Sequence, residues 1–122
     1  MLPAGHRLRS SGDFSAALRG RGSTRAGSAL LVVHANCADA RAGQLPRVGF
    51  VVSKAVGGAV VRNRVKRRLR AQMATRIGQV PAGTDVVVRA NPVAAQAISS
   101  DFGHELDRLL GRALSQRDRD VS

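Results

Sequence analysis

The hydrophobic positions of the chain change their spacing several times, and each change predicts a new element. Apolar residues at 13–19 fall three and four positions apart, as they do on one face of a short helix. Two later runs, at 29–34 and 47–53, are rich in valine and leucine and predict strands. Because a turn-rich connection separates the two runs, we expect these strands to pair as a hairpin.

From residue 61 the spacing becomes helical, because an apolar residue recurs at every fourth position: Val61, Val65, Leu69, Met73 and Ile77. This helix is predicted to start near Gly57 or Gly58 and to end at Gly78. A third strand is predicted at 85–89, where three valines stand in a row, and the Asn-Pro pair that follows would end it.

An amphipathic helix is predicted near the end of the chain. Its apolar face is formed by Phe102, Leu106, Leu109, Leu110, Ala113 and Leu114. We expect Ser99 or Ser100 to cap this helix and the polar tail at 116–122 to be frayed.

The predicted elements alternate in the order α-β-β-α-β-α, which indicates an α+β fold with one sheet backed by helices. A length of 122 residues favours a single domain spanning 1–122. The longest apolar runs are far shorter than the roughly 20 residues that a membrane span requires. The N-terminus has no apolar stretch typical of a signal peptide, and the one cysteine, Cys37, excludes a disulfide within the chain. We therefore expect a cytoplasmic protein.

The formal net charge is +12, and the excess is concentrated in one part of the chain. Residues 1–76 contain 15 Lys and Arg but only 2 Asp and Glu, whereas residues 77–122 contain 5 and 6. Of the 20 basic residues 18 are arginine, the side chain best suited to bidentate phosphate contacts. An uneven positive charge of this kind favours nucleic acid as the partner over a membrane surface.

The densest positive charge lies on the predicted helix that starts near residue 58. Six cations and one asparagine fall on it within nine positions: Arg62, Asn63, Arg64, Lys66, Arg67, Arg68 and Arg70. Like charges four residues apart repel one another, and no acid on this helix offsets them. A bound polyanion would supply the missing negative charge, although a solvated helix face is the simpler alternative.

The segment that leads into this helix is a second candidate for phosphate binding. Ser53-Lys54 is followed by Gly57-Gly58 and then by the helix, whose first N–H groups attract anions. The alternative is that the glycines only turn the chain.

No catalytic or metal-binding constellation is apparent. The three histidines lie far apart in sequence, and none has metal-ligand spacing to Cys37. The acids of the last helix alternate with arginines, which indicates surface ion pairs. We predict no catalytic side chain and no metal site.

The segment at 48–67 closely resembles the signature of the bacterial ribonuclease P protein family. The core of that signature is S-K, then G-x-A-V, then R-N-R-x-K-R, and all three parts are present here in order. Two further segments resemble family features. They are Arg7-Leu8-Arg9 followed by Asp13-Phe14, and the strand at 85–89. The resemblance covers about residues 6–115.

The resemblance implies a small mixed sheet of about four strands, with the additional strand near Arg25–Ser28. It also implies a left-handed β-α-β crossover through the basic helix. The family's partner is a catalytic RNA that, with Mg²⁺, removes the 5′ leader of precursor tRNA. The protein subunit supplies no catalytic side chains, binds no metal with certainty and requires no protein partner.

By resemblance, the seven residues of the basic helix would contact the catalytic RNA. A cleft between the first helix and the sheet would hold the single-stranded leader. The residues placed at this cleft are Phe14, Leu18, Ser53, Lys54 and Arg89. The chain departs from the family where it has Leu18 instead of a second aromatic residue and Ala55 instead of a second lysine.

Two other functions remain as alternatives. A structural ribosomal or RNA-assembly protein would bind RNA through the same basic helix without processing it. A DNA-binding architectural protein would need a groove-inserting arm or a dimer interface, and the sequence indicates neither.

Overall fold

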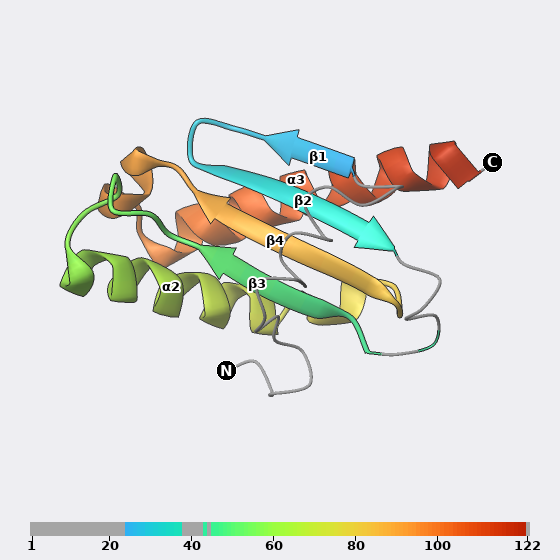
Figure 1. Cartoon of the computed structure of the whole chain (residues 1–122), viewed down its shortest axis with the longest axis horizontal. Helices are drawn as coiled ribbons and strands as arrows, with labels where there is room; N and C mark the ends of the chain where they lie inside the picture. The colour runs from blue at the N-terminus through green and yellow to red at the C-terminus, as the bar shows by residue number, and fades with distance from the viewer. Residues whose placement is uncertain (1–23, 38–42, 44, 122) are drawn as a thin grey trace.

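The computed structural model describes residues 24–37, 43 and 45–121, so the helix predicted at 13–19, with Phe14 and Leu18, lies outside the described residues. The described part forms a sheet backed by helices (Figure 1). Its elements are β1 (Thr24–Gly27), β2 (Leu31–Cys37), β3 (Arg47–Val51), α2 (Ala59–Ala74), the 3-10 helix η3 (Ile77–Gln79), β4 (Thr84–Ala90), the 3-10 helix η4 (Pro92–Gln96) and α3 (Ser99–Val121). The predicted α+β class is confirmed.

The sheet has four strands in the order β1-β2-β4-β3. β1 pairs with β2 and β2 with β4 in antiparallel fashion, whereas β3 and β4 are parallel, so the sheet is mixed. β1 is the additional strand that the resemblance implied near Arg25–Ser28. The hairpin predicted between the strands at 29–34 and 47–53 is wrong, because β4 lies between β2 and β3.

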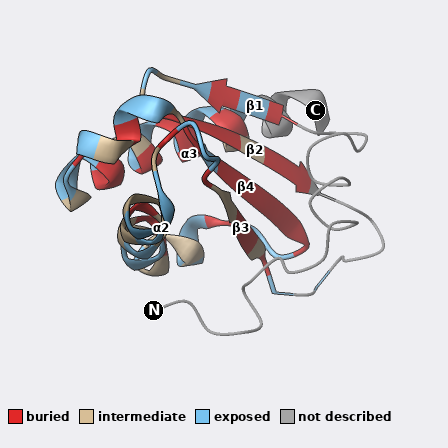
Figure 2. Ribbon diagram, turned by 60° about the vertical axis from the view of Figure 1, so that its left-hand side comes forward, coloured by how far each residue is buried: buried red, intermediate tan, exposed pale blue. Residues whose placement is uncertain are grey.

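The sequence of β4 explains why it takes the central position. Every residue of this strand except Arg89 is buried, which is typical of a strand covered on both faces and paired on both edges (Figure 2). A hairpin of β2 and β3 would leave this valine-rich strand at an edge of the sheet.

The two long helices, α2 and α3, pack on the same face of the sheet (Figures 1 and 2). The chain leaves β3, passes through α2 behind the sheet in the view of Figure 1 and returns as the parallel neighbour β4. This crossover is left-handed, as the resemblance implied, and is an exception to the usual right-handed rule.

The core lies between the sheet and these two helices. The largest side chains that are fully buried in it are Leu31, Val33, Val48 and Val86 from the sheet, Val65, Leu69 and Met73 from α2, and Phe102, Leu106, Leu109 and Leu110 from α3. The apolar positions that the sequence assigned to the two helices are therefore the ones that face the sheet.

The predicted apolar stripe of α2 is confirmed, but its predicted end is wrong. Val65, Leu69 and Met73 are buried and Val61 is half-buried. The helix ends at Ala74 with Thr75 as its C-cap, before the predicted Gly78. Ile77 belongs to η3, and this tighter turn keeps its side chain packed against the core.

The chain enters α2 through a turn that requires glycine at position 57. A Cβ atom there would lie 2.9 Å from Cβ and Cγ1 of Val61, a separation that real Cβ atoms essentially never show. Gly58 is the N-cap and has extended backbone. The predicted start of the helix near these two glycines is confirmed.

Two arginines of α2 hold the helix against the segment that links β4 to α3. Nη2 of Arg64 donates a hydrogen bond to the carbonyl oxygen of Ala95 (3.2 Å), and Nη1 of Arg68 donates one to that of Ala97 (2.7 Å). Both arginines are half-buried. The carbonyl dipoles therefore offset part of the repulsion within the basic helix.

A third arginine joins the far end of α2 to α3. Nε of Arg76 lies 2.7 Å from Oδ1 of Asp107, and its Nη2 lies 3.2 Å from Oδ2. α3 has a glycine, Gly103, at the point where it passes the ion pair of Arg76 and Asp107. A Cβ atom at this position would lie 2.7 Å from Oε1 of Gln72 and 2.9 Å from Nη2 of Arg76. Gly103 therefore leaves room for the side chains that link the helices.

The ends of α3 differ from the prediction. Ser99 and Ser100 lie inside the helix and do not cap it. Instead, Oδ2 of Asp101 accepts a hydrogen bond from the backbone N–H of Ile98 (3.1 Å), as the acid of a capping box does. The backbone is helical through Val121, so the polar tail predicted at 116–122 continues α3 as far as that residue.

The hydrogen bonds from α2 to the linking segment generate a test of stability. We expect Arg68→Ala to lower the free energy of unfolding by about 1–2 kcal/mol, because the Ala97 carbonyl loses its donor. Arg67→Ala, the matched control, removes the same charge from an exposed position and should change it by less than about 0.5 kcal/mol. Urea unfolding of the isolated protein measures both, and equal losses would contradict a structural role for Arg68.

Candidate nucleic-acid interface

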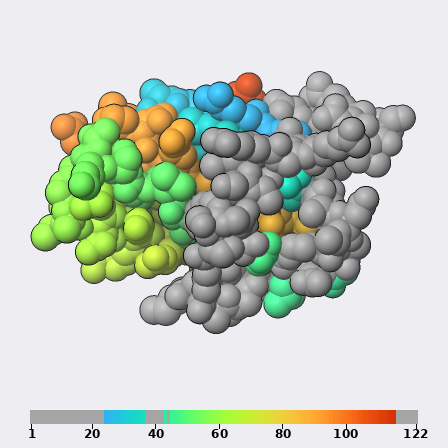
Figure 3. Space-filling view, in the orientation of Figure 1, coloured from blue at the N-terminus to red at the C-terminus, as the bar shows by residue number. Residues whose placement is uncertain are grey.

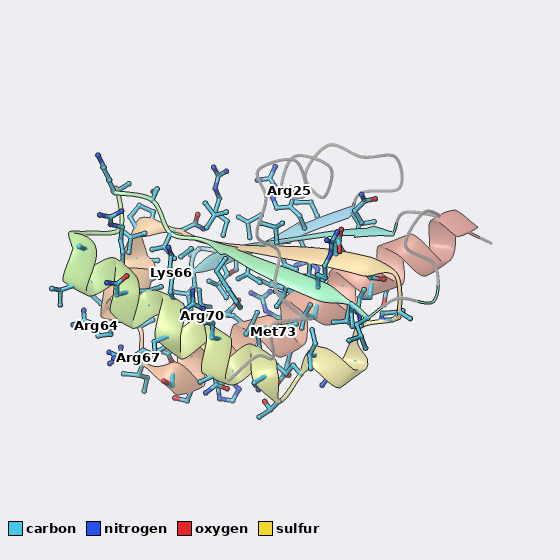
Figure 4. All side chains as sticks on the ribbon, turned by 60° about the horizontal axis from the view of Figure 1, so that its bottom comes forward. Arg25, Arg64, Lys66, Arg67, Arg70 and Met73 are labelled. Carbon is cyan, nitrogen blue, oxygen red and sulfur yellow. The ribbon has the colours of Figure 1, made fainter. Side chains whose placement is uncertain are left out.

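All seven residues predicted to bind RNA on the basic helix lie on α2, but they do not form one equivalent surface. Asn63, Arg67 and Arg70 are exposed, and helical spacing places them in one stripe opposite the buried one. Lys66 is half-buried and flanks this stripe. The stripe with Lys66 is here called the outer face of α2 (Figure 4).

The other arginines of α2 lie closer to the protein interior. Arg64 and Arg68 donate to η4 and to the residue that follows it, as described above. Arg62 is half-buried on the opposite side of the helix. The structure therefore distinguishes Arg64 and Arg68, which hold α2 in place, from the residues that form its outer face.

No acid neutralises the outer face of α2 within the described part of the chain. α2 itself contains no Asp or Glu. The ion pairs observed among the described residues involve Arg47, Arg76 and Arg108. Figure 3 shows the surface of α2 in green and yellow-green, adjoining the orange surface near η4 at one end of the molecule. This end therefore carries a cationic surface suited to a polyanion.

Ser53 and Lys54 lie in the turn between β3 and α2, and both are exposed. The turn is closed by a hydrogen bond from the backbone N–H of Val56 to the carbonyl oxygen of Ser53 (3.1 Å). No side chain caps the N-terminus of α2, and no acid occupies its first turn. The sequence thus correctly places a lysine and an open helix start close together.

Arg89 lies on the other face of the sheet, the one that α2 and α3 do not cover. It is exposed on β4 and pairs in register with Val51 of β3. Ser53 follows Val51 by two residues, so Ser53, Lys54 and Arg89 lie at the same end of the sheet. Three of the five residues predicted for the leader cleft are therefore near one another, whereas Phe14 and Leu18 lie outside the described residues.

Two neighbours of Arg89, an arginine and a histidine, were missed by the sequence reasoning. Arg25 of β1 lies opposite His34 of β2, and both point to the same face of the sheet as Arg89. Burial, followed by the charges of Arg25 and Arg89, lowers the pKa of His34 below its ordinary value. Alternation along β2 could have indicated the face of His34, but only the strand register brings the three residues together.

Two acids of α3, Glu105 and Asp107, form ion pairs as predicted, whereas Asp101 caps the helix instead. Oε2 of Glu105 lies 2.8 Å from Nη2 of Arg108, and this hydrogen bond lowers the pKa of Glu105. The hydrogen bond from Arg76 likewise lowers the pKa of Asp107.

Within the ranges that the structure describes, no three His, Cys, Asp or Glu side chains are grouped so that they could hold a metal ion. A search of the same residues finds no helix long and apolar enough to cross a membrane.

Comparisons with known proteins find similar sequences over most of the chain. The family model described as Ribonuclease P matches residues 2–114. The ribonuclease P protein component of Beutenbergia cavernae is 57% identical over 107 residues, which cover 88% of this chain and 87% of that protein. The component from Acidothermus cellulolyticus is 50% identical over 112 residues, which cover 92% and 91%.

Solved structures show the same fold. The RNase P protein of Staphylococcus aureus matches with a TM-score of 0.76 at 24% sequence identity, over 88% of this chain and 94% of that one. The RNase P protein of Thermotoga maritima matches with a TM-score of 0.69, also at 24% identity, over 84% and 92%. The family model and the curated relatives extend over most of the sequence, and the chain belongs to the ribonuclease P protein family.

Proposed function

We propose that this chain is the protein subunit of a ribonuclease P and binds both the catalytic RNA and the 5′ leader of precursor tRNA. By doing so it promotes the endonucleolytic cut that produces the mature 5′ end of the tRNA. The observation that carries this proposal is the outer face of α2, which is cationic and lacks any acid on its own helix. Asn63, Lys66 and Arg67 of this face belong to the family's R-N-R-x-K-R signature, and the family match covers residues 2–114.

The chemistry of the cut belongs to the RNA and its Mg²⁺ ions in this proposal. The protein contributes positive charge, which offsets repulsion between the phosphates of the two RNAs and lowers the Mg²⁺ concentration that they require. No side chain of this chain needs to donate or accept a proton in the reaction. We expect this activity in the cytoplasm, without a membrane or a protein partner.

The two cationic surfaces would have separate tasks. The outer face of α2 would contact the catalytic RNA through Asn63, Lys66, Arg67 and Arg70. The half-buried residues Arg62, Arg64 and Arg68 would add their positive charge from the sides of the helix. The leader would lie across the other face of the sheet, near the end that carries Ser53, Lys54 and Arg89. Because the surfaces lie on different sides of the molecule, one protein could bind both RNAs at once.

The function is tested by cleavage of a 5′-extended precursor tRNA by a bacterial ribonuclease P RNA at low Mg²⁺, with and without this protein. We expect strong stimulation by the protein and no cleavage by the protein alone. Tight RNA binding without stimulation would contradict the proposal and favour a structural RNA-binding protein.

The outer face of α2 is tested by the salt dependence of RNA binding. We expect Arg67→Gln combined with Arg70→Gln to weaken binding of the catalytic RNA and to reduce the slope of log K against log salt by roughly 0.7–0.9 per lost phosphate contact. Arg108→Gln combined with Arg112→Gln is the matched control, because it removes the same charge from exposed positions on α3. If both double variants reduce the slope equally, RNA affinity depends only on the net charge of the protein, and α2 is not the binding surface.

Phe14 is tested by the preference for precursor over mature tRNA. Base stacking on an aromatic ring contributes about 1–3 kcal/mol per base, so Phe14→Ala should reduce this preference more than it reduces affinity for the catalytic RNA. Competition binding to the reconstituted complex gives both values. Phe14→Leu keeps the apolar volume, and a preference that survives in both variants would show that Phe14 does not stack on the leader.

A further inference from the structure

The strand register brings three basic side chains together on the face of the sheet that α2 and α3 leave uncovered. Arg25 of β1 is directly opposite His34 of β2, and His34 is directly opposite Val87 of β4. Residues paired in this way point to the same face. Arg89 lies two residues beyond Val87 and therefore joins them on that face. Arg25, His34 and Arg89 are here called the sheet triad.

The sheet triad has no acidic partner among the described residues. The strands on either side of His34 carry one acid on this face, Asp85 of β4. Its carboxylate is already bound by Arg47 of β3, with Nε 2.9 Å from Oδ1 and Nη2 2.9 Å from Oδ2. Arg25 and Arg89 are exposed, so their positive charge is presented to solvent (Figure 4 shows Arg25 across the sheet from the labelled residues of α2).

The environment of His34 makes it sensitive to a bound anion. Its imidazole is half-buried, and Val87 opposite it is fully buried. Burial, followed by the charges of Arg25 and Arg89, lowers the pKa of His34 and so favours the neutral ring. A phosphate placed between the arginines would offset their repulsion and favour the protonated ring.

We propose that the sheet triad is a phosphate-binding site for the single-stranded 5′ leader, and that His34 takes up a proton when the leader binds. This inference rests on the proposed function and adds a property to it. Leader binding becomes tighter as the pH falls, because the imidazolium contributes a third positive charge. Arg25 and His34 would then be leader contacts in addition to Arg89.

The direction of the pH dependence follows from linkage. The pKa of His34 is lowered in the unbound protein and raised by the phosphate in the complex. Affinity therefore increases as the pH falls through the interval between the two values and is constant below it. A rise of one pKa unit on binding corresponds to a gain of about tenfold.

The test compares precursor tRNA with mature tRNA in the reconstituted complex of protein and catalytic RNA. The ratio of the two affinities cancels any effect of pH on the shared tRNA body. We expect this ratio to increase by about three- to tenfold between roughly pH 8 and pH 5.5. His34→Gln should abolish the increase, whereas His104→Gln, an exposed histidine of α3, should leave it unchanged.

A second variant distinguishes direct electrostatics from a structural role. Arg25→Gln removes one of the charges that disfavour the imidazolium, so the midpoint of the pH dependence should move to higher pH. A residue that only supports the fold would lower affinity without moving this midpoint. If the midpoint stays in place, the coupling between Arg25 and His34 is refuted.

A measurement on the unmodified protein avoids the risk that a variant does not fold. Nuclear magnetic resonance titration gives the pKa of His34 with and without a short single-stranded oligoribonucleotide. We expect the oligoribonucleotide to raise the pKa of His34. An unchanged His34 in the presence of bound RNA would overturn the proposal.

These measurements distinguish a failure of the role of His34 from a failure of the proposed function. A preference for precursor tRNA that does not vary with pH would refute the role of His34 and leave the proposed function standing. No preference for precursor tRNA at any pH, together with no stimulation of cleavage, would refute both.

Discussion

The burial of β4 is the constraint on which the rest of the structure depends. Its run of valines must be covered on both faces, and its backbone must be paired on both edges, so it takes the centre of the sheet. Because β3 reaches β4 in parallel, the connection between them has to cross over the sheet. That crossover is α2, and its position decides where the densest positive charge of the chain is displayed.

A helix with this much charge of one sign needs support from the rest of the protein. The buried stripe of Val65, Leu69 and Met73 attaches it to the core, and the hydrogen bonds of Arg64 and Arg68 fix it to the segment after β4. These contacts use two of the cations, and Lys66, Arg67 and Arg70 are presented on the outer face of α2. Residues of the family's signature therefore both hold the helix in place, as Arg64 does, and form its cationic outer face, as Lys66 and Arg67 do.

Local patterns in the sequence were sufficient for α2, because four-residue spacing depends only on the helix itself. The pairing of β2 and β3 was predicted incorrectly, since nothing local shows that a strand found more than thirty residues later will separate them. For the same reason the sequence could not divide the arginines of α2, because their partners are carbonyl groups of Ala95 and Ala97. His34 was overlooked because its neighbours, Arg25 and Arg89, are brought to it by strand register alone.

The central position of β4 also affects how the chain is made. Synthesis proceeds from the N-terminus, so the strand in the middle of the sheet is the last of the four to leave the ribosome. Until it emerges, β3 has no partner and β2 has one open edge, which is the condition that favours pairing with another chain. During that interval the positive charge of α2, already synthesised, opposes association between neighbouring nascent chains. The charge of α2 therefore has a consequence during synthesis, before the sheet is complete, as well as in the finished protein.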